Sequence, residues 1–415
     1  MSDASTHVIV GAGLAGAKAA EALRDEGFAG RIVLIGTEDE QPYERPPLSK
    51  DYLRGESARA KTHVHADGFY DSHDIELRTR TTVEALDTSA GQIGLSGGER
   101  IGYDRLLLAT GAEPRRLRVP GAGLDGVHYL RDLADADAIA ARLRQGGRMV
   151  VIGGGWIGAE VAASARLKGV EVALVEMGAV PLERVLGPEV GAVFAQLHRD
   201  NGVQLHTRAT LESFEGHGRV EQVRLADGTA LDCDFAVVGV GVIPRTALAE
   251  AAGLRTGDGI HVSKRLETSA QGVFAAGDVA SAFHPFYGAK LRVEHWANAL
   301  NQPATAAKAM LGKPASYERL PYFFSDQYDL GLEYTGHAEG WDQLMFRGDP
   351  SSREFVAFWL REGRVLAGMN VNVWDVTDPI RGLILSRAPV ATDRLSDPDV
   401  PLTELAAEAE RCRLA

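Results

Sequence analysis

Residues 8–16 read Val8-Ile9-Val10-Gly11-Ala12-Gly13-Leu14-Ala15-Gly16, a short apolar run that leads into three spaced glycines. In this pattern the first glycine permits a tight turn, the second lets the backbone approach a pyrophosphate, and the third lets a helix pack on the strand. Small apolar residues with helical spacing continue to Gly27, and a second apolar run covers residues 31–35. The stretch therefore predicts a strand–helix–strand unit of the kind that binds dinucleotides.

The same pattern returns at residues 150–158, which read Val150-Val151-Ile152-Gly153-Gly154-Gly155-Trp156-Ile157-Gly158. A helical pattern follows as far as Gly169, and the next apolar run, residues 171–175, leads to Glu176. The first unit has Glu38 in the comparable place. An acid at this strand end accepts hydrogen bonds from ribose hydroxyls. Two such units in register predict one fold used twice, with two dinucleotides bound.

Further buried-strand runs end in glycine-rich turns near residues 106–111, 236–241 and 274–278. The simplest arrangement inserts one nucleotide domain into another, and an α+β domain follows after Pro321, where the pattern changes to shorter strand-like segments and a closing helix near residues 402–413. The fold class is therefore α/β, with two nested Rossmann-like dinucleotide-binding domains plus a C-terminal α+β domain. The predicted boundaries are 1–112 with 245–320, 113–244, and 321–415.

Composition sets limits on the function. The chain has 415 residues, a net charge of −13, 45% hydrophobic and 24% charged residues, which is ordinary globular composition and excludes intrinsic disorder. An acidic protein is a poor nucleic-acid binder. The longest apolar run, residues 235–243, is far shorter than the ~20 residues of a membrane span. Residues 1–7 do not resemble a signal peptide, and Cys233 and Cys412 form no CxxC pair, so we expect a cytoplasmic protein.

Several motifs resemble a known family. Residues 11–16, 108–111, 153–158 and 276–278 are similar to flavoprotein reductases that bind two dinucleotides. Two narrower motifs, Arg45-Pro46-Pro47-Leu48-Ser49-Lys50 and residues 322–329, resemble the FAD-dependent NADH:ferredoxin reductases. These are the putidaredoxin reductase-like enzymes and the reductase components that serve ring-hydroxylating dioxygenases. The resemblance covers essentially the whole chain and implies a glutathione-reductase-like fold, with FAD on the N-terminal motif and NADH on the inserted one.

Site residues follow from the resemblance position by position. The implied FAD contacts are Gly11, Gly13, Ala15 and Gly16 at the pyrophosphate, Arg45, Lys50 near the flavin ring, Val83 beside the adenine, Thr110, Gly111, Arg131 at a hinge, Asp278 at the ribitol and Trp296 at the isoalloxazine. The FAD ribose would meet Glu38 or Thr37. The implied NADH contacts are Gly153, Gly155, Ile157, Gly158, Glu160, Glu176 and Gly241. On the residues alone, a solvated lysine at 50, a helix cap at 278 and core packing at 296 remain alternatives.

Two acidic residues define the chemistry expected at the nicotinamide. Glu160 lies in the first turn of the second helix, where it either complements the helix dipole or pairs with Lys50 near the reactive flavin nitrogen. Glu176 would hold the ribose hydroxyls and repel a 2′-phosphate. Because residues 177–180 contain no base, the prediction is NADH, not NADPH.

The absence of a cysteine pair beside the flavin excludes dithiol chemistry, so electrons must leave to an external acceptor. The resemblance implies a 2Fe–2S ferredoxin that serves a bacterial monooxygenase or dioxygenase, and the chain holds no cysteine set for a cluster of its own. An acidic ferredoxin would need a local basic patch, for which the candidates are Lys290, Arg292, Lys308, Lys313 and Arg319. Two other functions stay open: an apoptosis-inducing-factor-like redox-responsive interaction partner, and a rubredoxin reductase. The oligomeric state is also open.

Overall fold

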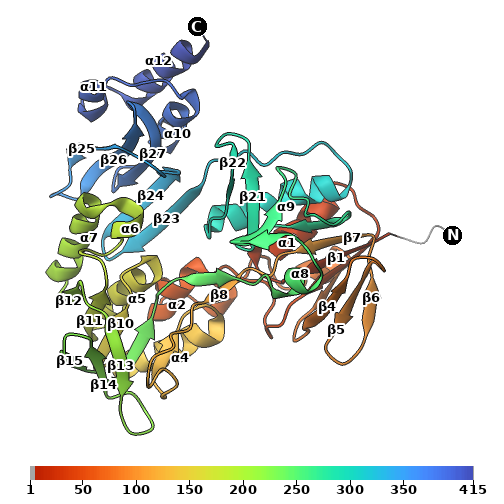
Figure 1. Cartoon of the computed structure of the whole chain (residues 1–415), viewed down its shortest axis with the longest axis horizontal. Coiled ribbons are helices and arrows are strands. Elements are labelled where there is room, and N and C mark those ends of the chain that lie inside the picture. The colour runs from red at the N-terminus through yellow and green to blue at the C-terminus, as the bar shows by residue number, and fades with distance from the viewer. Residues whose placement is uncertain (1–4, 415) are drawn as a thin grey trace. The chain divides into compact units, whose positions relative to one another are not determined.

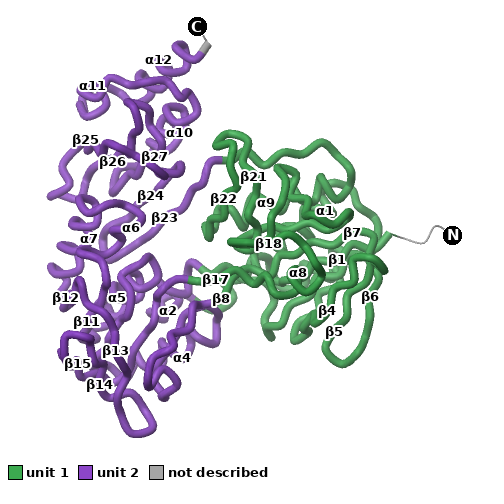
Figure 2. Tube along the Cα trace, viewed as in Figure 1, with its two compact units in different colours: residues 1–45, 58–113, 242–319 green, residues 46–57, 114–241, 320–415 purple. Residues whose placement is uncertain are grey.

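The computed structural model of this chain describes residues 5–414, and Figure 1 shows how its helices and strands follow one another. The signal-peptide expectation drawn from residues 1–7 rests in part on residues 1–4, which lie outside the described residues. The chain forms two compact units, each built from three separate stretches (Figure 2). Unit 1 contains Met1–Arg45, Ala58–Glu113 and Val242–Arg319; unit 2 contains Pro46–Ser57, Pro114–Gly241 and Leu320–Ala415.

Unit 1 is organised around a five-stranded parallel sheet with the strand order β20-β7-β1-β2-β3. Its strands are β1 (Thr6–Val10), β2 (Arg31–Ile35), β3 (Ile75–Arg78), β7 (Arg105–Leu108) and β20 (Val273–Ala275). The helices α1 (Leu14–Asp25) and α9 (Trp296–Met310) pack against each other. Val8, Ile9 and Leu107 are fully buried, as expected for parallel strands that are covered on both faces.

Smaller elements complete unit 1. Unit 1 has two further sheets: an antiparallel sheet with the order β4-β5-β6, and a mixed sheet with the order β18-β19-β21-β22 in which β19 and β21 run parallel. Their bounds are β4 (Val83–Asp87), β5 (Gln92–Leu95), β6 (Arg100–Gly102), β18 (Thr256–Gly257), β19 (Gly259–Val262), β21 (Ala280–His284) and β22 (Ala289–Leu291). The short helices are η2 (Arg59–Thr62), α3 (Phe69–Ser72) and α8 (Ala247–Ala251). Strands β8 (Ala112–Pro114) and β17 (Val242–Pro244) form a two-stranded ribbon.

Unit 2 repeats the parallel sheet, here with the order β12-β11-β10-β16-β9. The strands are β9 (Val127–Tyr129), β10 (Arg148–Ile152), β11 (Glu171–Glu176), β12 (Gln204–Thr207) and β16 (Phe235–Val238). The helices are η1 (Pro46–Ser49), α2 (Asp51–Arg54), α4 (Leu133–Gln145), α5 (Trp156–Leu167), α6 (Glu183–Leu186) and α7 (Pro188–Asp200). An antiparallel layer has the order β13 (Leu211–Glu215), β14 (Gln222–Leu225), β15 (Ala230–Asp232). Helix α2 contacts both α4 and α5.

The C-terminal part of unit 2 is an antiparallel sheet with the order β23-β24-β27-β26-β25 and helices near the end of the chain. The strands are β23 (Tyr322–Gln327), β24 (Leu330–Gly336), β25 (Gln343–Asp349), β26 (Glu354–Arg361) and β27 (Arg364–Val371), followed by α10 (Thr377–Ser386), α11 (Thr392–Ser396) and α12 (Leu402–Leu414). Trp359 is fully buried, and its Nε1 donates to the carbonyl oxygen of Leu186 at 3.2 Å. One hydrophobic core therefore joins this sheet to α6 and α7.

The predicted fold class is confirmed: both strand–helix–strand units, the later buried strands and the closing helix are present. The predicted three-domain boundaries remain a prediction. In the structure, residues 46–57 group with unit 2 although they lie inside the first predicted domain, and residues 320–415 group with residues 114–241. None of the helices in the described part of the chain has the length and hydropathy that a membrane-spanning helix needs.

Candidate functional site

The glycine-rich turn of unit 1 joins β1 to α1 with very little space. A Cβ on Gly11, whose φ is +115°, would lie 2.1 Å from the carbonyl oxygen of Ala109, and a Cβ on Gly16 would lie 1.9 Å from that of Gly11. Gly13 differs because a Cβ there would meet no atom within 4 Å. Gly13 is also the N-cap of α1, which has no side-chain cap and no acid in its first turn. An open helix N-terminus with free space beside it suits a pyrophosphate, so these residues fit the expected group.

Most of the other predicted FAD residues of unit 1 lie at the same edge of the sheet. Thr110 and Gly111 follow β7, Asp278 follows β20, and Glu38 follows β2. Because the strands are parallel, all of these follow carboxyl ends, and the strand order reverses between β1 and β7. Ligands of open α/β sheets bind at such a reversal. The hydroxyl of Thr110 donates to the carbonyl oxygen of Arg245 at 2.9 Å, which fixes the end of β7 to the third stretch of unit 1.

A polar cluster of Glu38, Tyr43 and Arg45 lies beside this edge. The guanidinium of Arg45 donates to Glu38 Oε1 at 2.8 Å and to the Tyr43 hydroxyl at 3.1 Å, and that hydroxyl donates to Glu38 Oε2. Burial alone would raise the pKa of Glu38, but Arg45 and Tyr43 outweigh it and lower the pKa. Asp278 also acts electrostatically on Arg45. Thr37, the alternative ribose contact, is exposed.

The remaining predicted FAD residues are divided between the units. Val83 starts β4 and is partly buried against the core of unit 1. Trp296 is the first residue of α9, and a hydrogen bond from it acts on Glu44, whose pKa is raised overall by burial. Lys50 and Arg131 belong to unit 2. The backbone N–H of Arg131 donates to Asp135 at 2.9 Å, just before α4.

The second glycine-rich turn joins β10 to α5 in unit 2 and repeats the geometry of the first. A Cβ on Gly153, whose φ is +100°, would lie 2.5 Å from the carbonyl oxygen of Gly239, and a Cβ on Gly158 would lie 1.9 Å from that of Gly153. Gly155 is the N-cap of α5 and has no side-chain cap. Ile157 is 43% exposed on the first turn of this helix. Gly241 follows β16 at the same carboxyl edge.

Glu176 braces the loop that follows β11. Its Oε2 accepts from the N–H of Gly154 at 2.6 Å, and its Oε1 accepts from the N–H of Gly178 at 2.7 Å. Glu183 holds the same loop from its other end, through the N–H of Ala179 at 2.6 Å. Each oxygen of Glu176 therefore accepts from one backbone N–H and can accept another hydrogen bond. Met177, the next residue in the chain, is 74% exposed.

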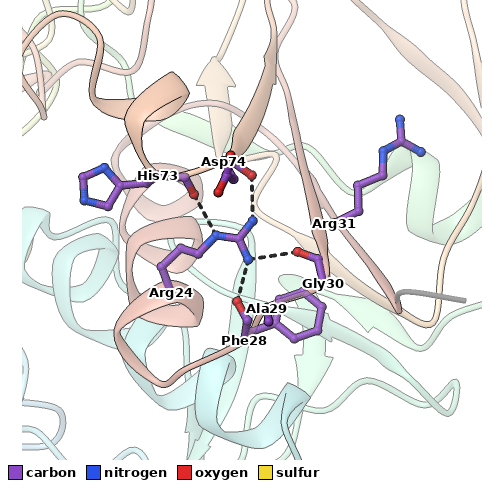
Figure 3. A pocket seen from close by; sticks show the side chains of 7 residues that line it. All are labelled: Arg24, Phe28, Ala29, Gly30, Arg31, His73 and Asp74. Carbon is purple, nitrogen blue, oxygen red and sulfur yellow. Dashed lines mark hydrogen bonds between the residues drawn. The ribbon is translucent and has the colours of Figure 1, made fainter. Parts of the chain in front are cut away.

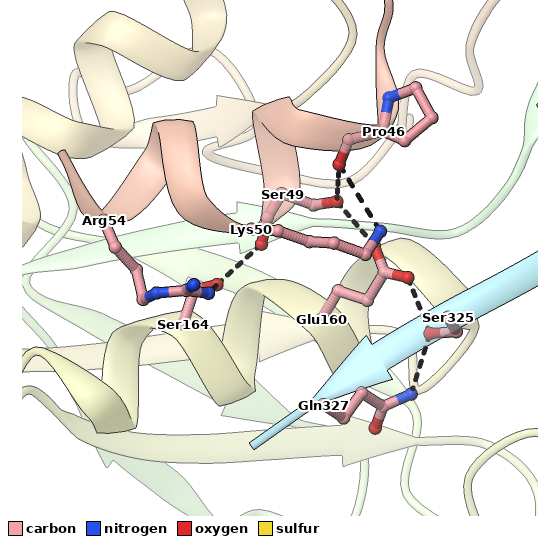
Figure 4. A network of polar contacts seen from close by, with 8 residues as sticks. All are labelled: Pro46, Ser49, Lys50, Arg54, Glu160, Ser164, Ser325 and Gln327. Carbon is pink, nitrogen blue, oxygen red and sulfur yellow. Dashed lines mark hydrogen bonds and ion pairs between the residues drawn. The ribbon is translucent and has the colours of Figure 1, made fainter. Parts of the chain in front are cut away.

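The expected ion pair between Lys50 and Glu160 is present in unit 2 (Figure 4). Lys50 Nζ lies 2.8 Å from Glu160 Oε2, and the two side chains are 12% and 5% exposed. Ser49 Oγ donates to the same Oε2 at 2.5 Å, while Ser325 Oγ donates to Oε1 at 2.6 Å. Ser49 and Ser325 were not predicted as site residues, although both lie in the motifs that carry the family resemblance. A buried carboxylate with three donors is a built site, because isolated buried charges are strongly unfavourable.

Two further groups lie near Lys50. Its ammonium is 5.6 Å from the ring centroid of Phe324. The pKa of Asp326 is raised, mainly by burial, although Lys50 acts to lower it and Glu160 acts to raise it. Residues 322–327 of the C-terminal sheet therefore contribute an aromatic ring, a hydroxyl and a carboxyl group to the surroundings of one lysine.

The two cysteines do not form a redox-active pair with each other. Cys233 is buried, and burial raises the pKa of its thiol to about 12, so it stays protonated at neutral pH. Cys412 is exposed on α12 and is likewise unpaired.

The expected basic patch needs correction. Arg292 lies between Asp258 at 2.8 Å and Glu294 at 2.6 Å, and its side chain is only 11% exposed. Lys308 and Lys313 both pair with Glu26, at 3.6 and 2.8 Å. Two carboxylates thus offset the charge of Arg292, and the single charge of Glu26 is shared by Lys308 and Lys313, so sequence proximity overstated the positive charge of these three residues. Lys290 and Arg319 are the two remaining candidate cations for a ferredoxin-docking surface.

A cavity of about 480 Å³ in unit 1 lies at the opposite end of the parallel sheet (Figure 3). Its lining residues come from the last turn of α1, from residues 28–31 at the start of β2, and from the two residues before β3. Arg24 crosses it and donates to four carbonyl oxygens, those of Phe28, Gly30, His73 and Asp74. The guanidinium of Arg24 thus connects three chain segments by hydrogen bonds. Because its role is structural, we assign the cavity no ligand.

Comparison with known proteins places this geometry in a family. Residues 5–303 match the family model described as pyridine nucleotide-disulphide oxidoreductase. The chain belongs to the pyridine nucleotide-disulphide oxidoreductase family. It is therefore an oxidoreductase, and membership implies a flavin and a pyridine nucleotide as cofactors. Residues 322–406 match a second model, described as reductase C-terminal, which covers most of the antiparallel sheet and its helices.

Individual members of the family narrow the comparison. Putidaredoxin reductase of Pseudomonas putida is 39% identical over 409 residues, which cover 97% of each chain. The ferredoxin–NAD(+) reductase component of the anthranilate 1,2-dioxygenase system of Burkholderia cepacia is 39% identical and covers 96% of this chain and 98% of its own. Among solved structures, the covalent putidaredoxin reductase–putidaredoxin complex superimposes with a TM-score of 0.94 at 38% identity, covering 98% of this chain and 99% of the other.

Proposed function

We propose that this chain is an FAD-dependent NADH:ferredoxin reductase that supplies a 2Fe–2S ferredoxin of a bacterial monooxygenase or dioxygenase system. One observation carries the proposal. Two uncapped, glycine-rich helix N-termini lie at the carboxyl edges of two parallel sheets, and a buried Lys50–Glu160 pair replaces the cysteine pair of disulphide reductases. Such a protein can bind two dinucleotides but cannot pass electrons to a thiol. The relatives named as ferredoxin reductase components of oxygenase systems support an iron–sulfur acceptor.

FAD binds, in this proposal, to unit 1, with its pyrophosphate at the N-terminus of α1. The space beside Gly13 and the lack of an acid in the first turn support that placement.

The domain assignment proposed from the sequence has residues 1–112 and 245–320 binding FAD, residues 113–244 binding NADH and residues 321–415 forming a C-terminal domain. FAD, when bound, accepts a hydride from a nicotinamide and releases its electrons one at a time. We propose the predicted contacts as its ligands: Gly11, Gly13, Ala15, Gly16, Glu38, Arg45, Lys50, Val83, Thr110, Gly111, Arg131, Asp278 and Trp296.

NADH binds at the second turn, where Glu176 selects against a 2′-phosphate. Its carboxylate carries one donor on each oxygen, so both oxygens keep room for a ribose hydroxyl. A phosphate at the same place would meet negative charge. One relative, from a Sphingomonas species, is named a ferredoxin–NAD(P)(+) reductase, so the choice of nicotinamide rests on this carboxylate. The further proposed contacts are Gly153, Gly155, Ile157, Gly158, Glu160 and Gly241.

The ion pair of Lys50 and Glu160 orients charge where the nicotinamide meets the flavin. Glu160 fixes the ammonium of Lys50, and three donors hold the carboxylate itself. We propose that Lys50 contacts the flavin and that the pair excludes water from the hydride path. The reaction takes place in the cytoplasm, as the unpaired cysteines lead us to expect.

Anaerobic stopped-flow absorbance at 450 nm tests the proposal. The purified holoprotein is mixed with NADH or NADPH, and a 2Fe–2S ferredoxin or a rubredoxin enters in a second mixing step. Bleaching that is fast with NADH and slow with NADPH, followed by rapid reoxidation by ferredoxin, is the expected result. Preferential reoxidation by rubredoxin would assign the other acceptor. Slow bleaching to a long-lived complex that neither protein reoxidises would overturn the reductase assignment and favour an apoptosis-inducing-factor-like interaction partner.

A further inference from the structure

The carboxylate of Glu160 is held from elements that lie far apart in the sequence. Its Oε2 accepts from Ser49 and Lys50, at the end of η1 and just beyond it, and its Oε1 accepts from Ser325 in the middle of β23 (Figure 4). Glu160 is 4% exposed and Ser325 is 1% exposed. The C-terminal sheet therefore reaches the Glu160 carboxylate through the hydroxyl group of Ser325.

The three donors hold the two oxygens of the carboxylate unequally: two act on Oε2 and one acts on Oε1. The terminal torsion of a glutamate is broad and roughly two-fold, so contacts to one oxygen alone leave the carboxylate free to rock. Ser49 and Lys50 both act on Oε2, whereas Ser325 acts on Oε1. Without Ser325, the orientation of the carboxylate and hence the direction of the Lys50 ammonium would be set from one side only.

The support behind Ser325 is rigid. Its strand pairs with β24 in continuous antiparallel register, with Ser325 opposite Leu332. Its hydroxyl oxygen also accepts a weak hydrogen bond from Gln327 Nε2 at 3.4 Å, which leaves the hydroxyl proton for Glu160. A side chain on a fixed strand that supports a reactive group from behind is the usual arrangement of a positioning residue.

We propose that Ser325 is a positioning residue for the reductase reaction: it fixes the Glu160 carboxylate, and through it the ammonium of Lys50, so that the C-terminal sheet tunes hydride transfer. This inference rests on the proposed function, because it needs Lys50 to act at the flavin. It assigns to the C-terminal sheet an indirect part in the chemistry, through Glu160 and Lys50, in addition to its packing against α6 and α7.

The test compares Ser325→Ala with the matched pair Ser325→Thr and Ser325→Val, which share a shape and differ only in the hydroxyl group. Ser164→Ala is the control, because Ser164 is a buried serine of α5 whose hydroxyl donates to the Ser49 carbonyl oxygen at 2.6 Å and not to the carboxylate. Three quantities are measured for each holoprotein. Anaerobic flavin bleaching gives the limiting rate and the NADH dissociation constant, and spectroelectrochemical titration gives the flavin midpoint potential.

We expect Ser325→Ala and Ser325→Val to lower the limiting rate about 5- to 10-fold, with the NADH dissociation constant within 2-fold of wild type. Their midpoint potentials become more negative, since a less well oriented ammonium stabilises the reduced flavin less. Ser325→Thr and Ser164→Ala keep the limiting rate and the NADH dissociation constant within 2-fold of wild type and the midpoint potential within error of wild type. If Ser325→Ala does not fold, the Thr–Val comparison decides alone.

Three results would be failures, and they can be told apart. Equal rates and potentials for the Thr and Val variants, with a wild type that NADH reduces rapidly, would overturn the role of Ser325 and leave the reductase function intact. A wild-type protein that NADH does not reduce would overturn the proposed function itself. An effect on the NADH dissociation constant alone would also contradict the inference, because a positioning residue for Lys50 acts on the transition state and not on binding.

Discussion

At the scale of single residues, Glu176 combines two tasks that a sequence pattern cannot separate. Its oxygens brace the backbone at Gly154 and Gly178, and the same carboxylate is the proposed ribose contact. The brace explains a detail of the glycine-rich turn: a Cβ on Gly154 would lie 3.1 Å from Glu176 Oε2. The middle position of the turn is therefore small because the acid must approach it closely.

Replacing this acid should change the choice of nicotinamide. We expect Glu176→Ala to lower kcat/KM for NADH about 10-fold and to raise it for NADPH, because the hydroxyl acceptor and the repulsion of a 2′-phosphate are both lost. Steady-state ferricyanide reduction with each nicotinamide measures the change. Glu183→Gln is the matched control, since Glu183 braces the same loop through Ala179; its NADH to NADPH preference should stay within 2-fold of wild type. An unchanged preference in Glu176→Ala would contradict the assignment.

At the Lys50–Glu160 site, the sequence predicted the ion pair but not the serines that hold it. The ion pair was predicted because both residues lie in motifs with a known chemical role. The two serines were not, because their function depends on a carboxylate rotamer and on the tertiary pairing of β23 with α5, which no local pattern encodes. The charge of the expected basic patch was overestimated for a similar reason: Glu26 lies far from Lys308 and Lys313 in sequence, yet pairs with both.

At the scale of secondary structure, contact between α7 and β23 buries an imidazole. His198 is fully buried, and its Nδ1 lies 3.1 Å from the hydroxyl group of Tyr328, just after β23. Burial lowers the pKa of His198 to about 4, against the effect of Gln327. Because the folded pKa lies below the unfolded value, the unfolded state binds the proton more readily, and stability present above pH 6.5 is lost as the pH falls toward 4.

Acid should therefore destabilise unit 2 through this helix–strand contact. Between pH 7 and pH 5 we expect His198 to account for about 2 kcal/mol of lost unfolding free energy. Urea denaturation at both pH values, on wild type and His198→Gln, isolates this contribution, since the other histidines are common to both proteins. His7, whose pKa burial also lowers to about 4, serves as such a background group in unit 1. Equal losses in the two proteins would show that His198 does not titrate in this way.

Elements were predictable where the chain is apolar in runs. The strands of both parallel sheets and the helices after each glycine-rich turn follow from buried runs such as residues 106–108 and 236–238. The smaller sheets β4-β5-β6, β18-β19-β21-β22 and β13-β14-β15 were not predicted. Strand β4, for example, reads Val-Glu-Ala-Leu-Asp and is mostly exposed, so neither burial nor alternation marks it as a strand, and its pairing with β5 depends on a turn.

At the scale of the whole molecule, function depends on a partner, and charge on unit 1 offers a way to find where it docks. We expect Lys290→Glu, on the exposed strand β22, to raise the KM for an acidic ferredoxin about 3-fold and to leave NADH–ferricyanide turnover unchanged. Lys168→Glu makes the same charge change on an exposed residue of unit 2 and should affect neither assay. Arg292→Glu is unsuitable, because it would place a third carboxylate beside Asp258 and Glu294. Equal losses in both assays for Lys290→Glu would contradict a docking role.

The interleaved order of the chain also has a consequence for synthesis on the ribosome. Strands β1, β2, β3 and β7 emerge within the first 113 residues, but β20 and α9, which complete the same layer, come from residues 242–319. Until then β7 has an unpaired edge and α1 lacks the helix against which it packs. The nascent N-terminal half must keep this apolar surface from aggregating while the inserted unit is translated. A fragment that ends at residue 113 therefore lacks β20 and α9 and leaves the edge of β7 and one face of α1 uncovered.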